Sequence, residues 1–281
     1  GTEWDCGGGI CGYDYVIQCD EGGGGSGEGS GSSGGGVNTL PTGGGTTTVA
    51  SPCKKFKKQQ ETYPDLKQAL INLEATKTQN HENGIFINSS SSSIHDLPTT
   101  SVAGAAVGMP DLPTGVKYKV AGHTHDATGP NATGTYSIFS WGDLSRVASL
   151  IKSGQIDDEI FTLYLASADN TRYAITIDWP NSFANYFDVT YVPDDPTKNF
   201  NSKKYKELKE TEDEYYKDGA IVGSGKIGLA TNPQDDLVIF LKMIKELKLN
   251  VSLFQVDPTY STFTKLTLSS NNTVELGTPC N

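Results

Sequence analysis

The chain has 281 residues, a hydrophobic content of 36% and a formal net charge of −11, which is enough apolar material for one or two cores. Residues 1–53 hold six of the 33 acids and none of the 22 bases, so the remainder is only mildly acidic. That balance argues against nucleic-acid binding by charge and so against a nuclease. No apolar run approaches the roughly 18 residues of a membrane-spanning helix, so we expect no membrane span.

Glycine divides the chain into unequal parts. Residues 1–50 contain 18 of the 32 glycines, and the glycine- and serine-rich stretch 21–50 cannot bury apolar surface. We expect residues 21–50 to be a disordered, flexible linker and residues 1–20 to be the end of a preceding region. Residues 51–281 are expected to form one globular domain. The chain begins with what resembles the interior of a longer protein, so we expect a C-terminal fragment or a matured product.

A helix is expected soon after the linker. The basic cluster KKFKK at 54–58 is typical of a solvated helix start. Leu66, Leu70 and Leu73 recur at helical spacing, and Pro64 suits an early helical turn.

Strands and helices then mix without regular alternation. The expected elements are, in chain order, a strand within 81–88, a serine loop at 89–93, a strand within 114–126, a helix at 141–154, a hairpin of strands at 159–167 and 171–178, a charged helix at 201–219, an amphipathic helix at 232–250, and strands at 251–256 and 263–270. This order predicts an α+β class, or loosely a mixed α/β one.

Five cysteines occur, three of them within residues 1–20. None forms a C-x-x-C pair, which argues against a zinc knuckle. Cys53 and Cys280 flank the expected globular domain, as a disulfide joining its ends would, and such a bond favours an extracytoplasmic setting. The odd number leaves at least one cysteine as a thiol or for a partner outside this chain. Five independent thiols are the alternative.

Residues 121–144, AGHTHDATGPNATGTYSIFSWGDL, combine two histidines with an acid. His123 and His125 lie two residues apart at a strand end, so both imidazoles point to one side. Asp143 falls in the first turn of the next helix, where a carboxylate is favoured. Three such ligands with one open position are what a catalytic Zn²⁺ needs. The alternative is a polar strand end with two ordinary histidines.

A zinc hydrolase also needs a general base and a donor for the oxyanion. Ser140, three residues before Asp143, offers a hydroxyl that can serve as that donor. Glu82, at the start of the strand within 81–88, is the best candidate for the base.

Glu82, the pair His123 and His125, and the sequence SWGD at 140–143 together resemble the motif of the JAMM/MPN+ metalloproteases, which include deubiquitinating isopeptidases and bacterial relatives. The resemblance covers about residues 60–180 and extends to the order of the elements. The spacer of 14 residues between the second histidine and the serine is longer than in the family. The chain also resembles bacterial secreted or surface proteins with a glycine-rich lead-in and a cysteine-bounded C-terminal domain.

The resemblance implies a JAMM-like central sheet flanked by helices, with a C-terminal extension of helices and strands. It implies that His123, His125 and Asp143 bind Zn²⁺, that Glu82 is the base and that Ser140 holds the oxyanion. The implied reaction is hydrolysis of a peptide or isopeptide bond in a protein or peptide, outside the cytoplasm, at the end of a larger surface or secreted protein. The alternative is a non-catalytic binding or assembly module of the same fold, because many MPN proteins lack a metal.

Overall fold

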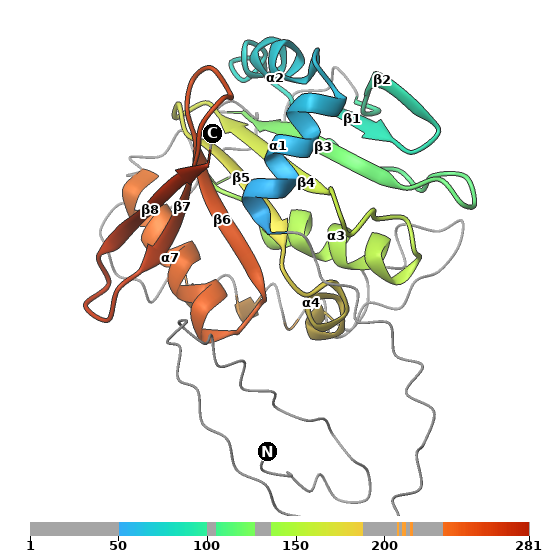
Figure 1. Ribbon diagram of the computed structural model, residues 1–281. Coiled ribbons are helices and arrows are strands. Elements are labelled where there is room, and N and C mark those ends of the chain that lie inside the picture. The colour runs from blue at the N-terminus through green and yellow to red at the C-terminus, as the bar shows by residue number, and fades with distance from the viewer. Residues whose placement is uncertain are drawn as a thin grey trace, which may run out of the picture. The chain divides into compact units, whose positions relative to one another are not determined.

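The computed structural model describes residues 51–99, 105–126, 136–187 and 233–280, with isolated positions between 207 and 215 (Figure 1). The expected N-terminal segment, the linker and nearly all of the expected helix at 201–219 lie outside these residues. The described residues belong to one unit, which spans residues 47–281. They form helices and a mixed sheet, so the expected α+β class is confirmed.

The sheet has eight strands in the order β2-β1-β3-β4-β5-β6-β7-β8. The strands are β1 (Gly84–Asn88), β2 (Ser91–Asp96), β3 (Tyr118–His125), β4 (Thr162–Ser167), β5 (Arg172–Ile177), β6 (Val251–Val256), β7 (Phe263–Leu268) and β8 (Val274–Cys280). All neighbours are antiparallel except β3 and β4, which are parallel. A parallel pair needs a long crossover connection, and this one contains helix α3 (Trp141–Lys152).

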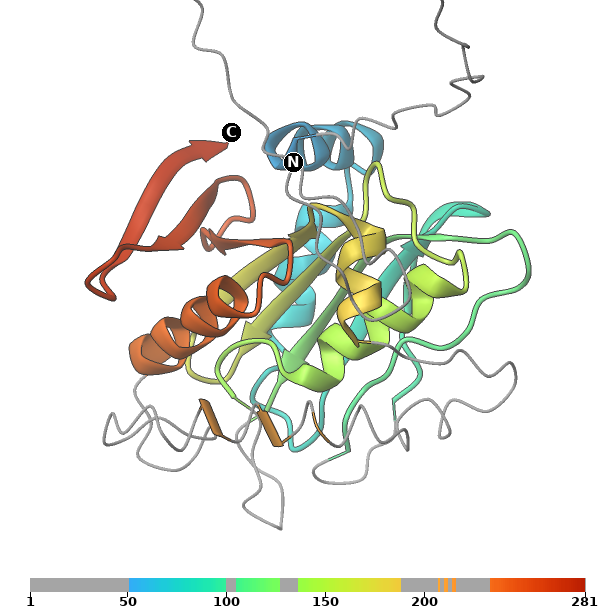
Figure 2. The same ribbon diagram turned by 90° about the horizontal axis from the view of Figure 1, so that it is seen from below.

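Helices cover both faces of the sheet (Figure 2). Helices α1 (Pro52–Thr62) and α2 (Leu66–Glu74) lie on one face, and α3, α4 (Pro180–Phe187) and α7 (Pro233–Glu246) lie on the other. Each face buries its own core, and β3 contributes to both: Val120 packs in the first and Ala121 in the second. Because successive strand residues alternate between faces, His123 and His125 share the second face with Ala121.

The core under α1 is rich in aromatic rings. Phe56 stacks on Phe263 with 3.9 Å between ring centroids. The expectation of a solvated helix start at 54–58 is therefore wrong in part, since Phe56 is only 1% exposed and Lys55 2%. The Lys55 ammonium donates to the carbonyl of Asp158 at 2.7 Å. A lysine stem can pack as apolar surface when its charged end finds acceptors, and charge counting along the sequence does not detect this.

Gly122 on β3 allows α2 to approach the sheet closely. A Cβ atom there would lie 3.3 Å from Cδ2 of Leu70 and 3.3 Å from Cβ of Tyr164. Contacts this short are tighter than ordinary packing, so a larger residue would push α2 outward. The glycine directly before His123 thus lets the first core close against β3 next to the histidines.

A disulfide joins Cys53 in α1 to Cys280 in β8, with 5.2 Å between the Cα atoms, so the expected pairing is confirmed. It ties the first helix to an edge strand whose neighbour in the sheet is β7. Such bonds typically contribute about 2–4 kcal/mol to stability. Among the described helices, none is both long and apolar enough to cross a bilayer.

Most expected elements are present, and three differences stand out. Residues 91–93 of the expected serine loop belong to β2, because its backbone pairs with β1 although serine does not favour strands. Helix α4 and strand β8 were not predicted. Five consecutive residues of β8 are exposed, so this edge strand lacks the alternation by which strands are found.

Candidate metal centre

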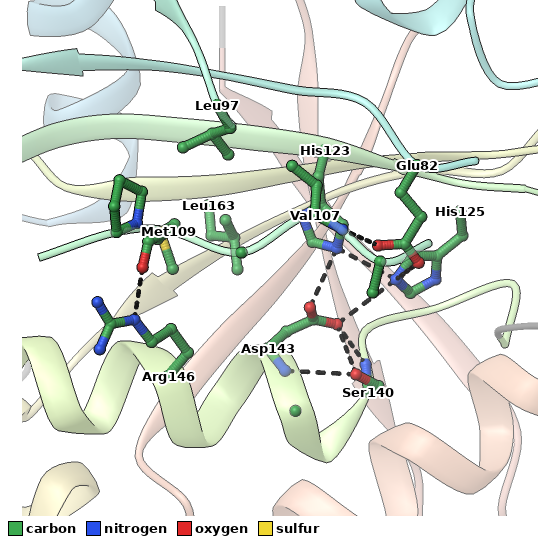
Figure 3. Close-up of a pocket in the computed structure, with 14 residues that line it drawn as sticks. Glu82, Leu97, Val107, Met109, His123, His125, Ser140, Asp143, Arg146 and Leu163 are labelled. Carbon is green, nitrogen blue, oxygen red and sulfur yellow. Dashed lines mark hydrogen bonds and ion pairs between the residues drawn. The ribbon is translucent and has the colours of Figure 1, made fainter. Parts of the chain in front are cut away.

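The candidate ligands come from the two ends of one connection. Strand β3 ends in His123 and His125, and Asp143 lies in the first turn of α3. In a strand–helix–strand crossover, the carboxyl end of the strand and the start of the helix lie at the same edge of the sheet. The fold therefore brings Asp143 over the two imidazoles (Figure 3).

The three ligand groups converge. Nε2 of His123 lies 3.1 Å from Nε2 of His125 and 3.1 Å from Oδ1 of Asp143. Nε2 of His125 lies 3.6 Å from Oδ2 of Asp143. Ligand atoms bound at about 2.0–2.1 Å to a tetrahedral ion stand roughly 3.3 Å apart. This group can therefore hold a metal ion, as the sequence predicted.

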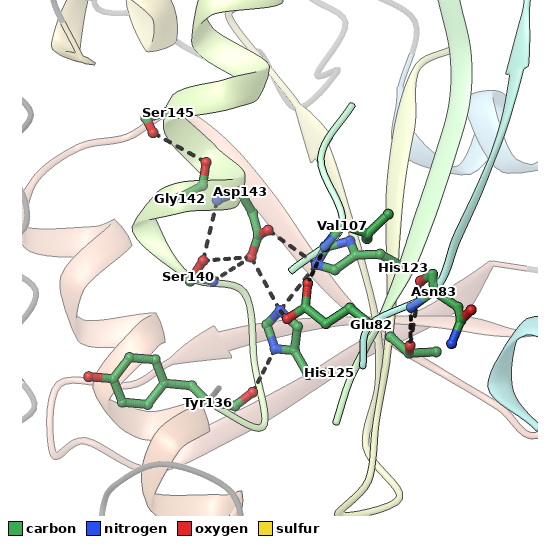
Figure 4. Close-up of polar contacts among 11 residues, drawn as sticks. Glu82, Asn83, Val107, His123, His125, Tyr136, Ser140, Gly142, Asp143 and Ser145 are labelled. Carbon is green, nitrogen blue, oxygen red and sulfur yellow. Dashed lines mark hydrogen bonds and ion pairs between the residues drawn. The ribbon is translucent and has the colours of Figure 1, made fainter. Parts of the chain in front are cut away.

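A backbone carbonyl fixes the orientation of the His125 ring. Nδ1 of His125 lies 2.7 Å from the carbonyl oxygen of Tyr136 (Figure 4). A carbonyl only accepts, so Nδ1 donates and Nε2 is the nitrogen directed at the other ligands. The second group on a metal-binding histidine is commonly such an acceptor. Sequence analysis missed Tyr136, because a backbone carbonyl carries no residue-type signal.

Asp143 also begins helix α3. Its Oδ2 accepts hydrogen bonds from the backbone N–H of Ser140 at 2.7 Å and from the Ser140 hydroxyl at 2.9 Å. In return, the Asp143 N–H donates to the Ser140 hydroxyl at 3.3 Å. This capping box fixes the carboxylate. It leaves Oδ1 directed at His123.

Glu82 lies beside His125, just before β1. Gly84 pairs with His123 across the sheet, so Glu82, two residues earlier, stands on the same side and opposite His125. Its Oε1 is 3.9 Å from Nε2 of His125, and its Oε2 accepts from the N–H of Val107 at 2.9 Å. One pocket is therefore lined by every site residue that the sequence predicted: Glu82, His123, His125, Ser140 and Asp143.

The pocket has a volume of about 460 Å³. Beyond the polar cluster, its walls are mainly apolar: Leu97, Ala106, Val107, Met109, Pro110 and Leu163 (Figure 3). Arg146, one turn after Asp143, also lines it. Its Nε donates to the carbonyl of Met109 at 2.6 Å, and Nη2 pairs with Asp111 at 2.7 Å. Arg146 thereby holds one wall of the pocket in place.

The cluster favours positive charge at its centre. Burial lowers the pKa of His125, but the hydrogen bond to Asp143 and the charges of Glu82 and Asp143 outweigh it and raise that pKa to about 9. Burial raises the pKa of Asp143, but the two histidines hold it well below its usual range. Burial raises the pKa of Glu82, against the opposing effect of the histidines. Two carboxylates and two imidazoles in this arrangement suit a cation.

Comparison with known proteins gives no relative: no family model, curated protein or solved structure matches the chain. The resemblance to the JAMM/MPN+ metalloproteases therefore stays a prediction, and a functional assignment depends on the chemistry of the site.

Proposed function

We propose that the chain is a zinc-dependent hydrolase of peptide or isopeptide bonds, of the JAMM/MPN+ type. The observation that carries the proposal is the position of Glu82, whose Oε1 lies 3.9 Å from Nε2 of His125 in the pocket that also holds His123 and Asp143. Two imidazole nitrogens and one carboxylate oxygen suit a three-ligand zinc site with one open position. A carboxylate beside such a site suits general base catalysis.

Each residue then has a defined role. His123, His125 and Asp143 would hold Zn²⁺, which would supply Lewis acidity to the reaction. Glu82 would take a proton from the attacking water at Oε1 and return it to the leaving amine. The N–H of Val107 donates a hydrogen bond to Oε2 of Glu82. That contact leaves Oε1 as the oxygen available for proton transfer.

Ser140 has a positioning role in this proposal as well as the predicted one. Its hydroxyl donates to Oδ2 of Asp143 and so steadies a metal ligand. To stabilise an oxyanion, the same hydroxyl must turn from Asp143 to the substrate. A Ser140→Ala variant therefore loses both contributions together.

The substrate that best suits the pocket is a polypeptide with an apolar side chain next to the cleaved bond. Leu97, Met109 and Leu163 line the space beside the ligands. Burying an apolar side chain there is favourable by roughly 1.5–3 kcal/mol. Arg146 adds little preference for an acidic side chain, because Asp111 already pairs with its charge at 2.7 Å.

The setting that fits the disulfide is extracytoplasmic, on a secreted or surface protein. The bond between Cys53 and Cys280 supports this part of the proposal, since disulfides persist mainly in oxidising compartments. The partners are then a protein or peptide substrate and the preceding part of a larger chain or surface complex.

A second candidate function is a non-catalytic binding or assembly module. The observation in its favour is the capping box, because Asp143 has a structural role at the start of α3 with or without a metal. The two functions differ in what Glu82 does: a binding module has no use for a base beside the ligands.

The test replaces Glu82 by glutamine, which keeps the shape and removes the basic oxygen. Wild type and Glu82→Gln, each loaded with zinc, are incubated with a proteome-derived peptide library and with lysine-isopeptide-linked peptides, and products are identified by mass spectrometry. We expect Glu82→Gln to retain zinc and to lose cleavage by about 10²–10⁴-fold. Glu74→Gln, which alters a buried carboxylate on the other face of the sheet, is the control and should cleave normally.

Equal cleavage by wild type and Glu82→Gln would remove Glu82 from the mechanism. No cleavage of either probe by zinc-loaded wild type would contradict the hydrolase and favour the binding module.

A further inference from the structure

Helix α7 reaches the metal centre through one buried residue. Asp236, in the first turn of α7, is 0% exposed, as is Ser137. Oδ2 of Asp236 accepts from the Ser137 N–H at 3.2 Å and from the Ser137 hydroxyl at 2.8 Å. The two residues are 99 positions apart in sequence. Ser137 directly follows Tyr136, whose carbonyl accepts from His125.

A single peptide group joins these contacts. The carbonyl of Tyr136 and the N–H of Ser137 belong to the same planar unit, which is trans. In a trans unit the C=O and N–H point in opposite directions. One side of this unit therefore faces Nδ1 of His125, at 2.7 Å, and the other faces Asp236. Any rotation of the unit that breaks one contact also breaks the other.

The far side of Ser137 is held as well. Its carbonyl accepts from the hydroxyl of Thr171 at 2.5 Å. The Thr171 hydroxyl also lies 2.6 Å from the hydroxyl of Ser167, the last residue of β4. The N–H, hydroxyl and carbonyl of Ser137 are thus all bonded, by two elements distant in sequence. This leaves the preceding peptide unit little freedom to turn.

The geometry points to Asp236 as a positioning residue for the metal ligand His125. Asp236 fixes the peptide unit between Tyr136 and Ser137, and the carbonyl of that unit holds Nδ1 of His125, which presents Nε2 to the metal. The carboxylate charge also polarises the peptide group and makes its carbonyl a stronger acceptor. The inference rests on the metal centre of the proposed function but not on its hydrolytic reaction.

A comparison with Asp235 distinguishes the positioning role of Asp236 from a stabilising effect at the start of helix α7. Asp235 lies in the same first turn of α7, where any carboxylate is favoured by the partial positive charge of the helix end. It is only partly buried, and no contact joins it to Ser137. Asp235→Ala therefore removes a helix-end charge alone, whereas Asp236→Ala also releases the peptide unit.

The test measures zinc affinity by chelator competition for wild type, Asp236→Ala, Asp236→Asn and Asp235→Ala. Metal-free unfolding and the visible spectrum of the Co²⁺-loaded forms are recorded alongside. We expect Asp236→Ala to weaken zinc binding about 10–100-fold, the usual effect of losing a partner that orients a ligand. Asp236→Asn should recover most of this loss, because its amide oxygen still accepts from Ser137. Asp235→Ala should bind zinc as wild type does.

The cobalt spectrum gives a readout that a purely structural role would not change. We expect its bands to shift in Asp236→Ala and to stay unchanged in Asp235→Ala. If Asp236→Ala does not fold, Ser137→Ala decides, with Ser252→Ala as its control. Ser252 donates a similarly buried hydroxyl to Asp178 at 2.7 Å, and only Ser137→Ala should weaken zinc binding.

A folded Asp236→Ala, or in its place Ser137→Ala, with the zinc affinity and cobalt spectrum of wild type would overturn the inference and leave the metal centre intact. Wild type that binds no zinc would overturn the metal centre itself, and this inference with it.

Discussion

Two clusters of charged side chains are buried on opposite faces of one sheet. On the face covered by α1 and α2, Glu74 receives two hydrogen bonds from Arg172, at 2.6 and 2.5 Å. Lys77 pairs with Glu74 at 2.7 Å, and the Tyr260 hydroxyl donates to it at 3.2 Å. Every partner of this carboxylate is a donor, and its charge is neutralised by side chains alone.

The cluster at the end of β3 is composed differently. It joins two carboxylates, Glu82 and Asp143, to the imidazoles of His123 and His125. Within the described part of the chain, neither carboxylate forms an ion pair with a lysine or an arginine. The two Nε2 atoms face each other at 3.1 Å, an arrangement that requires a cation or a proton between or beside them.

The difference separates a structural cluster from a ligand site. Around Glu74 the protein itself supplies the positive charge, so this carboxylate needs no counter-ion, and removing one partner would leave a buried charge poorly compensated. At the end of β3 the acceptors converge on a space that opens to a pocket, so a bound cation can supply the positive charge in place of protons on the histidines.

The largest effect is expected for Arg172→Ala. It leaves the buried Glu74 with Lys77 as its remaining ion-pair partner, and we expect the free energy of unfolding to fall by about 3 kcal/mol, at the low end for a broken buried pair. Urea unfolding at pH 7 measures this. Zinc affinity should not change, and a variant that loses zinc binding would show that the two clusters are not independent.

Zinc should stabilise the protein through the β3 cluster alone. At a free zinc concentration 100 times the dissociation constant, binding adds about 2.7 kcal/mol to the free energy of unfolding. We expect this increment in wild type and in Arg172→Ala, and none in His123→Ala. Thermal unfolding with zinc and with chelator measures it. Equal stabilisation of His123→Ala would place the bound zinc elsewhere.

A smaller effect is expected in how the contribution of Glu74 to the free energy of unfolding changes at acid pH. Burial raises the pKa of Glu74, but the bonds and charges of Arg172 and Lys77 outweigh it and lower that pKa below its ordinary value of 4.5. A lowered pKa in the folded state means stability that is present above pH 4.5 and is lost as the pH falls through the folded value. The stability difference between wild type and Glu74→Gln should therefore shrink from pH 5 to pH 3. A difference that grows over this range would reverse the assigned sign.

The smallest effect is expected for an exposed ion pair of the same kind. Lys58 and Glu159 approach to 3.2 Å, but their side chains are 55% and 75% exposed. Solvent screens such pairs, so Lys58→Ala should cost less than about 0.5 kcal/mol. A cost close to that of Arg172→Ala in the same urea assay would remove burial as the reason for the difference.

The sequence predicted which side chains converge in the pocket better than it predicted the contacts around them. The reason is that the converging residues are close in sequence. His123 and His125 are two residues apart, and Asp143 follows within the same crossover, so strand and helix periodicity suffice to bring them together. The pairing of Cys53 with Cys280 followed from their places at the two ends of the expected domain.

Contacts that depend on backbone atoms or on distant chain segments could not be predicted. The Tyr136 carbonyl and the Val107 N–H hold His125 and Glu82, but any residue supplies these groups. Asp236 reaches Ser137 from a helix 99 positions away, and no spacing rule links them. Lys55 was expected to be solvated, because the sequence shows its charge but not the backbone carbonyl of Asp158 that accepts from it.

The most direct test is the metal content of purified protein, measured by elemental mass spectrometry on wild type, His123→Ala and Glu74→Gln after zinc is supplied and excess removed. The two buried clusters predict about one zinc per chain in wild type and in Glu74→Gln, and none in His123→Ala. Wild type without metal, or His123→Ala with as much as wild type, would contradict the assignment of His123, His125 and Asp143 as a metal centre.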